Sequence, residues 1–349
     1  MTDSSRSRAD VRVTLGGHTR RSRSDAAHPW HHCPTMPIDS VPSAPVGPSL
    51  RGTWSILPTP FDAQGRLDTT SLTRLVEAAA AWGVDGLTAM GVMAEPGSLA
   101  ADEREAALRT IFEAAVGRLP VAVGCSATTV GGVVALARQA EDLGAVALMV
   151  APPVLLRNVD LLPEFYRAVA AGVGLPLIVQ DEPAATGVNV PVSVLLASLA
   201  AAGARIVKLE DPPTPPKIAR LLAQDPTLDV FGGLGGAASL WELERGACGT
   251  MTGFAYPEIL RAIRLAHEAD DAERSGRLFD RYLPLLAYEA QPVVGLAIRK
   301  ELLRRRGALS HATIRGPGGS LDDATLAALD RVLARLGIEP SIAPYLPTT

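Results

Sequence analysis

The sequence has little cysteine and no long hydrophobic run. Its 349 residues include three cysteines, Cys33, Cys125 and Cys248, which lie far apart with no paired spacing. This pattern fits neither a disulfide framework nor a zinc knuckle, and a reducing cytoplasm is the expected compartment. No stretch approaches the roughly 20 uninterrupted apolar residues that span a bilayer, so we expect no membrane partner. With 47% hydrophobic residues, the chain can still bury a sizeable core.

The chain also lacks an excess of positive charge, and it contains very little lysine. Its formal net charge of -4 gives no electrostatic reason to expect binding to nucleic acid or to an anionic membrane. Of its 33 basic residues, only Lys208, Lys217 and Lys300 are lysines. Each lysine in such a chain therefore needs a physical explanation, above all Lys208 in the apolar segment "RIVKLEDPP".

The first fifty residues differ from the rest. Residues 1–50 are rich in Ser, Arg, Pro and Gly, contain four of the six histidines and show little apolar periodicity. We expect them to form a disordered tail. A start codon assigned too early, with Met36 as the next candidate, is the alternative. The segment "HPWHHC" has no second cluster of metal ligands, so we expect no metal site.

Eight short apolar runs alternate with longer amphipathic stretches from Thr53 onward. Stretches such as "LTRLVEAAAAW" carry apolar residues three and four positions apart, which predicts helices. Short runs that are apolar throughout are typical of parallel strands covered by helices on their faces. The expected strands span residues 54–58, 86–90, 120–124, 146–150, 176–180, 205–209, 228–232 and 249–253.

Eight strand–helix units predict the α/β class and a (β/α)₈ TIM barrel over residues 51–270. The competing architecture is an open, doubly wound sheet. That fold usually has a Gly-rich G-x-G-x-x-G turn after its first strand, whereas this chain has "PTPFDAQG" there. Three further helical patterns predict a C-terminal helical extension over 271–340 that packs on the barrel, followed by a tail, 341–349.

The carboxyl ends of the strands form the active-site mouth of such a barrel, and Lys208 lies at one of them. A low-dielectric surrounding disfavours the charged ammonium and leaves an amine that can attack a ketone to form an imine. Arginine cannot replace it, because its guanidinium stays protonated. The alternative is a structural lysine that pairs with Glu210 or Asp211, or that extends its ammonium to water.

Several segments, in order, resemble the family of dihydrodipicolinate synthase and N-acetylneuraminate lyase, which are class I, Schiff-base-forming aldolases and dehydratases. The resemblance runs from about residue 51 to 336 through "PTPF", "GVMAE", "VAVG", "EPAATG", the strand with Lys208 and "GACGTMTG". It implies that Lys208 forms an imine with a pyruvate-like 2-keto acid, that no cofactor is needed, and that the protein is a homo-oligomer, a dimer or tetramer. It also implies that Gly233 and Met251 lie beside the substrate.

Several positions depart from the family's pattern. Hydroxyl side chains that bind the substrate carboxylate are replaced by Val92 and Met93, although the backbone amides of that turn can still hold a carboxylate. The family's proton-shuttling tyrosine corresponds to Gln180, a second tyrosine to Val154, and an arginine of some members to Ala185. Glutamine donates hydrogen bonds but does not titrate, so we expect Gln180 to orient groups without carrying protons.

Four carboxylates follow the fifth and sixth predicted strands: Asp181, Glu182, Glu210 and Asp211. Strand alternation puts Lys208 and Glu210 on one face, which makes Glu210 the best-placed acid or base. Otherwise these carboxylates lie in water or keep Lys208 charged. Glu95 is expected to be a structural anchor for its loop.

The glycines of "FGGLGGAASLWEL" could cradle a phosphate, but we favour a close approach of the backbone to the substrate. Cys125 and Cys248 are expected to be buried, and His267 and His311 to be peripheral. The sequence thus predicts a lyase that uses Lys208 on a 2-keto acid in aldol cleavage, condensation or dehydration. Two alternatives remain open: a catalytically silent keto-acid or sugar-acid binding barrel with a sensor or regulatory role, and a lyase that works through Glu210 without an imine.

Overall fold

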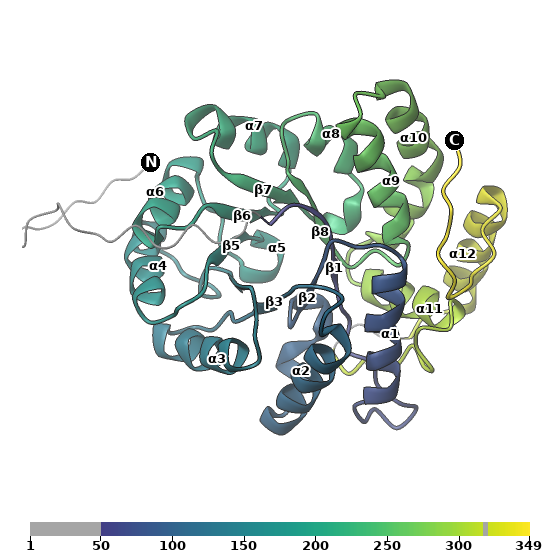
Figure 1. Ribbon diagram of the computed structural model, residues 1–349, viewed down its shortest axis with the longest axis horizontal. Coiled ribbons are helices and arrows are strands. Elements are labelled where there is room, and N and C mark those ends of the chain that lie inside the picture. Colours follow the sequence, from purple (N-terminus) through teal and green to yellow (C-terminus); the bar gives the residue numbers. More distant parts are fainter. Residues whose placement is uncertain (1–49, 317–319) are drawn as a thin grey trace, which may run out of the picture. The chain divides into compact units, whose positions relative to one another are not determined.

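A closed barrel of eight parallel strands forms the centre of the computed structural model, which describes residues 50–316 and 320–349. The strands follow one another around the barrel in chain order, and β1 closes it by pairing with β8 (Figure 1). This confirms the predicted TIM barrel. The strands are β1 Gly52–Ile56, β2 Gly86–Ala89, β3 Val121–Gly124, β4 Ala147–Val150, β5 Leu177–Asp181, β6 Ile206–Leu209, β7 Asp229–Gly232 and β8 Gly249–Thr252.

Helices connect the strands and surround the barrel, and three more follow its last unit. The helices are α1 Thr69–Ala81, α2 Ala101–Ala115, α3 Val130–Asp142, α4 Leu162–Ala171, α5 Pro183–Thr186, α6 Val192–Ala202, α7 Thr214–Gln224, α8 Ser239–Leu243, α9 Pro257–Glu268, α10 Ala272–Glu289, α11 Gly295–Arg305 and α12 Asp323–Leu336. Side-chain caps fix some helix starts: Asp68 accepts from the amide of Ser71 at 2.9 Å, and Asp322 from that of Thr325 at 2.7 Å.

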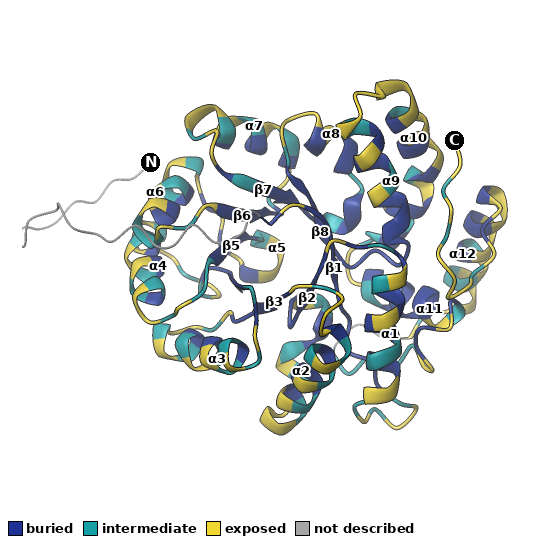
Figure 2. Ribbon diagram, viewed as in Figure 1, coloured by how far each residue is buried: buried dark blue, intermediate teal, exposed yellow. Residues whose placement is uncertain are grey.

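The strands are buried on both faces, so the sheet divides the core in two (Figure 2). One set of side chains fills the barrel and includes Trp54, Met149, Phe231 and Met251. The other set packs between the sheet and the helices. This double burial explains why the strands read as continuous apolar runs.

The first strand is shifted from its predicted position. It begins at Gly52, where the expected run began at Trp54, because Gly52 and Thr53 pair with Gly249 and Thr250 of β8. It ends at Ile56, before Pro58, whose ring nitrogen cannot donate to a ladder. The expected tail, residues 1–49, and its histidines lie outside the described residues. Leu50, which was assigned to that tail, is buried in the barrel interior.

The C-terminal helices join the barrel along α9. Helix α10 packs against α9, and α11 and α12 pack against α10 (Figure 1). The turn between α10 and α11, residues 290–294, reaches the mouth of the barrel beside the ends of β6 and β8. The extension therefore forms part of the wall of the central cavity.

Candidate active site

Strand β6 places Lys208 inside the barrel. Val207 and Leu209 point outward into the helix layer, so Lys208 points inward, and its side chain is only 2% exposed. The ammonium contacts the carboxylate of Glu210, two residues further along the same face. The predicted placement of both side chains on one face is what the structure has, and the ion pair is the contact that the alternative of a structural lysine named.

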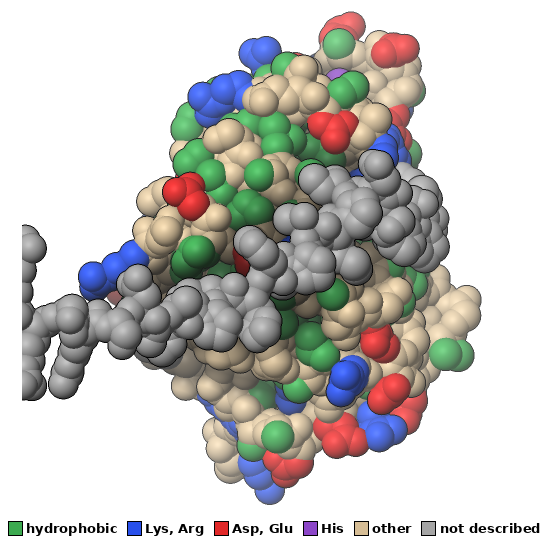
Figure 3. Space-filling model, turned by 90° about the vertical axis from the view of Figure 1, so that its left-hand side faces the viewer, with side chains coloured by type: hydrophobic (Ala, Val, Ile, Leu, Met, Phe, Trp, Pro, Cys, Tyr) green, Lys and Arg blue, Asp and Glu red, His purple; other side chains and the backbone are tan. Residues whose placement is uncertain are grey.

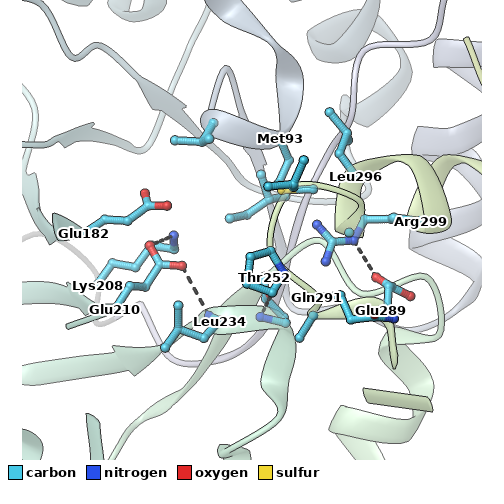
Figure 4. A pocket seen from close by; sticks show the side chains of 17 residues that line it. Met93, Glu182, Lys208, Glu210, Leu234, Thr252, Glu289, Gln291, Leu296 and Arg299 are labelled. Atoms are coloured by element: carbon cyan, nitrogen blue, oxygen red, sulfur yellow. Dashed lines mark hydrogen bonds and ion pairs between the residues drawn. The ribbon is translucent and has the colours of Figure 1, made fainter. Parts of the chain in front are cut away.

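A cavity of about 290 Å³ opens above Lys208 at the carboxyl ends of the strands. Glu182 and Glu210 lie beside the lysine on one side of it, and Arg299 and Glu289 lie on the other (Figure 4). A second cavity, of about 180 Å³, shares Val92 and Glu182 with the first. The lysine nitrogen therefore faces a space of the size that small-molecule sites require.

Gln180 links the two carboxylates beside the lysine. Its residue pairs with Lys208 in the β5–β6 register. Its amide nitrogen donates to Glu182 at 2.6 Å and to Glu210 at 2.9 Å. Both hydrogens of the amide are thus committed, so Gln180 orients both acids.

Glu182 is a second titratable group beside the lysine, although the sequence favours Glu210. Burial, together with the negative charge of Glu210, raises the pKa of Glu182 to about 7, and Lys208 opposes the shift. A carboxyl with this pKa exchanges protons readily near neutral pH. The alternation rule that paired Lys208 with Glu210 also puts Glu182 on the face of Gln180, so the signal was present in the sequence.

Asp181 and Asp211, the other two carboxylates of the cluster, form ion pairs with Lys217. Lys217 donates to Asp181 at 2.5 Å, to Asp211 at 2.7 Å and to the carbonyl of Val190 at 2.7 Å. Asp181 is buried, so the picture of loop carboxylates in water is wrong for it, and for Glu210 as well. Glu95 accepts from Lys300 at 2.5 Å and from the amides of Arg315 and Gly316, as expected of a loop anchor.

The turn after β2 contributes Val92 and Met93 to the cavity wall. The amides of Ala94 and Glu95 bond within the turn, to the carbonyls of Gly91 and Val92. Those of Val92 and Met93 have no acceptor among the described residues. Two backbone donors are thus available at the cavity.

Two expected substrate contacts do not line the cavity. Met251 is fully buried in the barrel interior, where its side chain packs below the mouth. Gly233 lies against the side chain of Glu210, where a Cβ would come within 2.3 Å of Oε1. Their neighbours Thr252 and Leu234 line the cavity instead. Glycine at 233 thus makes room for Glu210.

Arg299 and Glu289, on α11 and α10, were not foreseen. Arg299 donates from Nε to Glu289 at 2.5 Å, and both residues line the cavity. In sequence they are ordinary charges in amphipathic helices, and only the fold brings them to the mouth of the barrel.

Within the described residues, no group of three His, Cys, Asp or Glu side chains is arranged to hold a metal. In the same part of the chain, no helix is both long and apolar enough to cross a membrane.

Fold and site together define a (β/α)₈ barrel with a buried strand lysine among carboxylates. Residues 49–336 match the model of the dihydrodipicolinate synthetase family, and the chain belongs to this family of lyases and dehydratases. It is 30% identical to an L-2-keto-3-deoxyarabonate dehydratase of Azospirillum brasilense, over 83% of this chain and 95% of that protein. It is 32% identical to a 4-hydroxy-tetrahydrodipicolinate synthase of Acidobacterium capsulatum, over 83% and 96%.

Solved structures agree with this assignment. The crystal structure of a dihydrodipicolinate synthase from Rhodopseudomonas palustris is 34% identical in sequence. It superposes with a TM-score of 0.78 and covers 82% of this chain and 97% of its own. The described barrel with its C-terminal helices is therefore the family's architecture.

Proposed function

We propose that this lyase acts on a pyruvate-like 2-keto acid through an imine between Lys208 and the keto carbon. The observation that carries the proposal is the position of Lys208: its nitrogen is buried, faces a cavity and contacts the carboxylate of Glu210. An ammonium must lose a proton before it can attack a carbonyl. Glu210 accepts that proton within a contact already made.

The groups at the site can supply and accept every proton that imine formation requires. The Nζ lone pair forms a bond to the keto carbon, and one amine proton passes to the carbonyl oxygen. Protonated Glu182 supplies the second proton, and the oxygen leaves as water, giving a protonated imine. The imine accepts the electron pair when a proton or a carbon–carbon bond at C3 is lost, and ionised Glu182 takes up the C3 proton. Gln180 keeps both acids in place through its two hydrogen bonds.

We assign the carboxylate of the keto acid to the free amides of Val92 and Met93. Backbone N–H groups bind anions without any particular side chain, so the loss of the family's hydroxyls leaves this contact possible. The chemistry requires no metal and no organic cofactor, because the protonated imine is the electron sink.

Borohydride trapping tests the function directly. Incubation with pyruvate and borohydride should add the reduced adduct to one peptide, that of Lys208, as seen by mass spectrometry. An adduct on another lysine, or no adduct with several 2-keto acids, would overturn the imine. Stabilisation by keto acids without any adduct would favour the silent binding barrel.

We also infer a homo-oligomer, and the cytoplasm remains the expected location. Helix α6 has no charged residue, and hydrophobic side chains are frequent on the part of the α4 and α6 side that is visible in Figure 3. Such a surface suits contact between subunits. Sedimentation analysis measures the assembly, and a monomer at all concentrations would refute it.

A further inference from the structure

Arg299 presents two unused nitrogens to the cavity. Its side chain is 4% exposed, and Nε donates to Glu289 at 2.5 Å. Among the described residues, neither Nη1 nor Nη2 has a hydrogen-bond acceptor. Both point away from Glu289 toward the cavity (Figure 4). A ligand in the cavity can therefore accept hydrogen bonds from both nitrogens of this guanidinium.

The guanidinium is held in a fixed position. Glu289 is fully buried, and its two oxygens accept from the amide of Ala255 at 3.2 and 3.1 Å. Residue 253 is glycine, and a Cβ there would lie 3.0 Å from Nη1. The chain thus clears space for the outer nitrogens and fixes the inner one. This leaves the fork of two donors that suits a carboxylate.

Arg299 is remote from the reacting group. Lys208, Glu182 and Glu210 lie together at one side of the cavity and Arg299 lies at the other (Figure 4). The guanidinium attracts a carboxylate at its own side of the cavity, across from the lysine. The charges therefore favour a ligand with an anionic end distant from its keto carbon.

We propose that Arg299 binds a second, distal carboxylate, so that the substrates of this enzyme are 2-keto acids with an acidic group at both ends. The inference rests on the proposed function, which places the keto carbon at Lys208 and the first carboxylate on the amides of Val92 and Met93. Glu289 acts as a positioning residue for Arg299.

A matched pair of keto acids tests this assignment. 2-Oxoglutarate and 2-oxopentanoate have the same five-carbon chain and differ in a terminal carboxylate or methyl group. Half-saturation of borohydride trapping should occur at a concentration at least about 10-fold lower for 2-oxoglutarate, as a charged hydrogen bond predicts. Arg299→Met should abolish this preference, so that 2-oxoglutarate and 2-oxopentanoate half-saturate trapping at concentrations within about 3-fold of each other.

The variants separate recognition from folding. Arg299→Met leaves Glu289 buried and unpaired, so the double variant R299M/E289Q repeats the measurement without that charge. Arg264→Met is the control, because Arg264 is also buried and pairs with Asp85 and Glu268, yet it lies outside the cavity wall. It should keep the preference.

Binding of acids without a keto group provides a readout that does not depend on the imine. Calorimetric titration with glutarate and with pentanoate should show tighter binding of glutarate, and R299M/E289Q should remove the difference. Absence of adducts with glutarate binding intact would refute the imine and leave the distal site standing. Equal affinities for the two acids, or an equal loss of both in the variant, would overturn the role of Arg299.

Discussion

Lys208 and Lys300 are both buried lysines that contact a glutamate, but their surroundings differ. Lys300 donates to Glu95 at 2.5 Å and to the carbonyl of Thr313 at 2.8 Å, and it lies 4.6 Å from the centre of the Phe61 ring. Lys208 contacts Glu210 and otherwise faces the cavity. Lys217 resembles Lys300, with three acceptors around its nitrogen.

The difference shows what a rare lysine signifies in this chain. All three lysines are buried. A lysine in this arginine-rich chain therefore marks a buried position and does not by itself mark a catalytic residue. Two lysines join distant segments: Lys217 has three acceptors, and Lys300 has two acceptors and an aromatic ring. The third has an open side toward a space that a ligand can enter, and that feature makes it the candidate nucleophile.

Replacing each lysine by arginine should separate the roles most strongly. Lys208→Arg should remove the trapped adduct and slow the exchange of pyruvate C3 protons in D₂O at least about a thousandfold, because a guanidinium does not become a nucleophile. Lys217→Arg should retain the adduct in its folded fraction. Mass spectrometry measures the adduct and proton NMR measures the exchange. Normal exchange by Lys208→Arg would show that Lys208 is not the nucleophile.

Removing the charge of Lys300 should affect stability next most strongly. Lys300→Met should lower the free energy of unfolding by about 3–5 kcal/mol, because Glu95 is left charged and buried. Lys208→Met should cost less than half as much, since Glu210 borders the cavity. Urea denaturation measures both values, and adding Glu95→Gln to Lys300→Met should recover part of the loss. Equal costs would contradict the comparison.

Glu182 should give the lysine site a pH dependence that Lys300 lacks. With its pKa raised to about 7, Glu182 is protonated below this pH and ionised above it, so the rate of imine formation should fall as pH rises through about 7. Glu182→Gln should slow the step about 100-fold and flatten the profile. Rapid mixing with pyruvate followed by borohydride quenching measures the rate. A variant with the original profile would exclude Glu182 as the acid.

Replacing Glu242 should have the smallest effect on stability. This buried carboxylate has no ion pair within the part of the chain that the structure describes. It accepts from Thr214 at 2.5 Å, and within the described residues its Oε2 has no partner. Burial raises the pKa of Glu242 from 4.5 to about 7. The folded state therefore binds the proton more tightly than the unfolded state, and stability should fall as pH rises from 4.5 to 7.

The matched variant checks that sign. Glu242→Gln should be more stable than the original protein at pH 8, by about 1–3 kcal/mol, and the advantage should shrink toward pH 5. Urea denaturation at both pH values measures it. A constant difference would show that ionisation is not the cause.

Much of the barrel could be predicted from the sequence because its signals are local. Eight apolar runs, alternation along β6 and the order of motifs place Lys208 and Glu210 inside the mouth. The start of β1 was misplaced because pairing with β8, nearly 200 residues away, sets it. Arg299 was missed for the same reason: its helix shows an amphipathic pattern, and only long-range packing makes part of that helix a cavity wall.

The barrel and the C-terminal extension each contribute one side of the cavity. The ends of β5 and β6 hold Lys208, the candidate nucleophile, with Glu182 and Glu210, while α10 and α11 provide the opposite wall. A change in those two helices can therefore alter which molecules are admitted while the strand that carries the amine stays the same. Substrate range could thus change through Arg299 and its neighbours, about ninety residues downstream of Lys208 in the sequence.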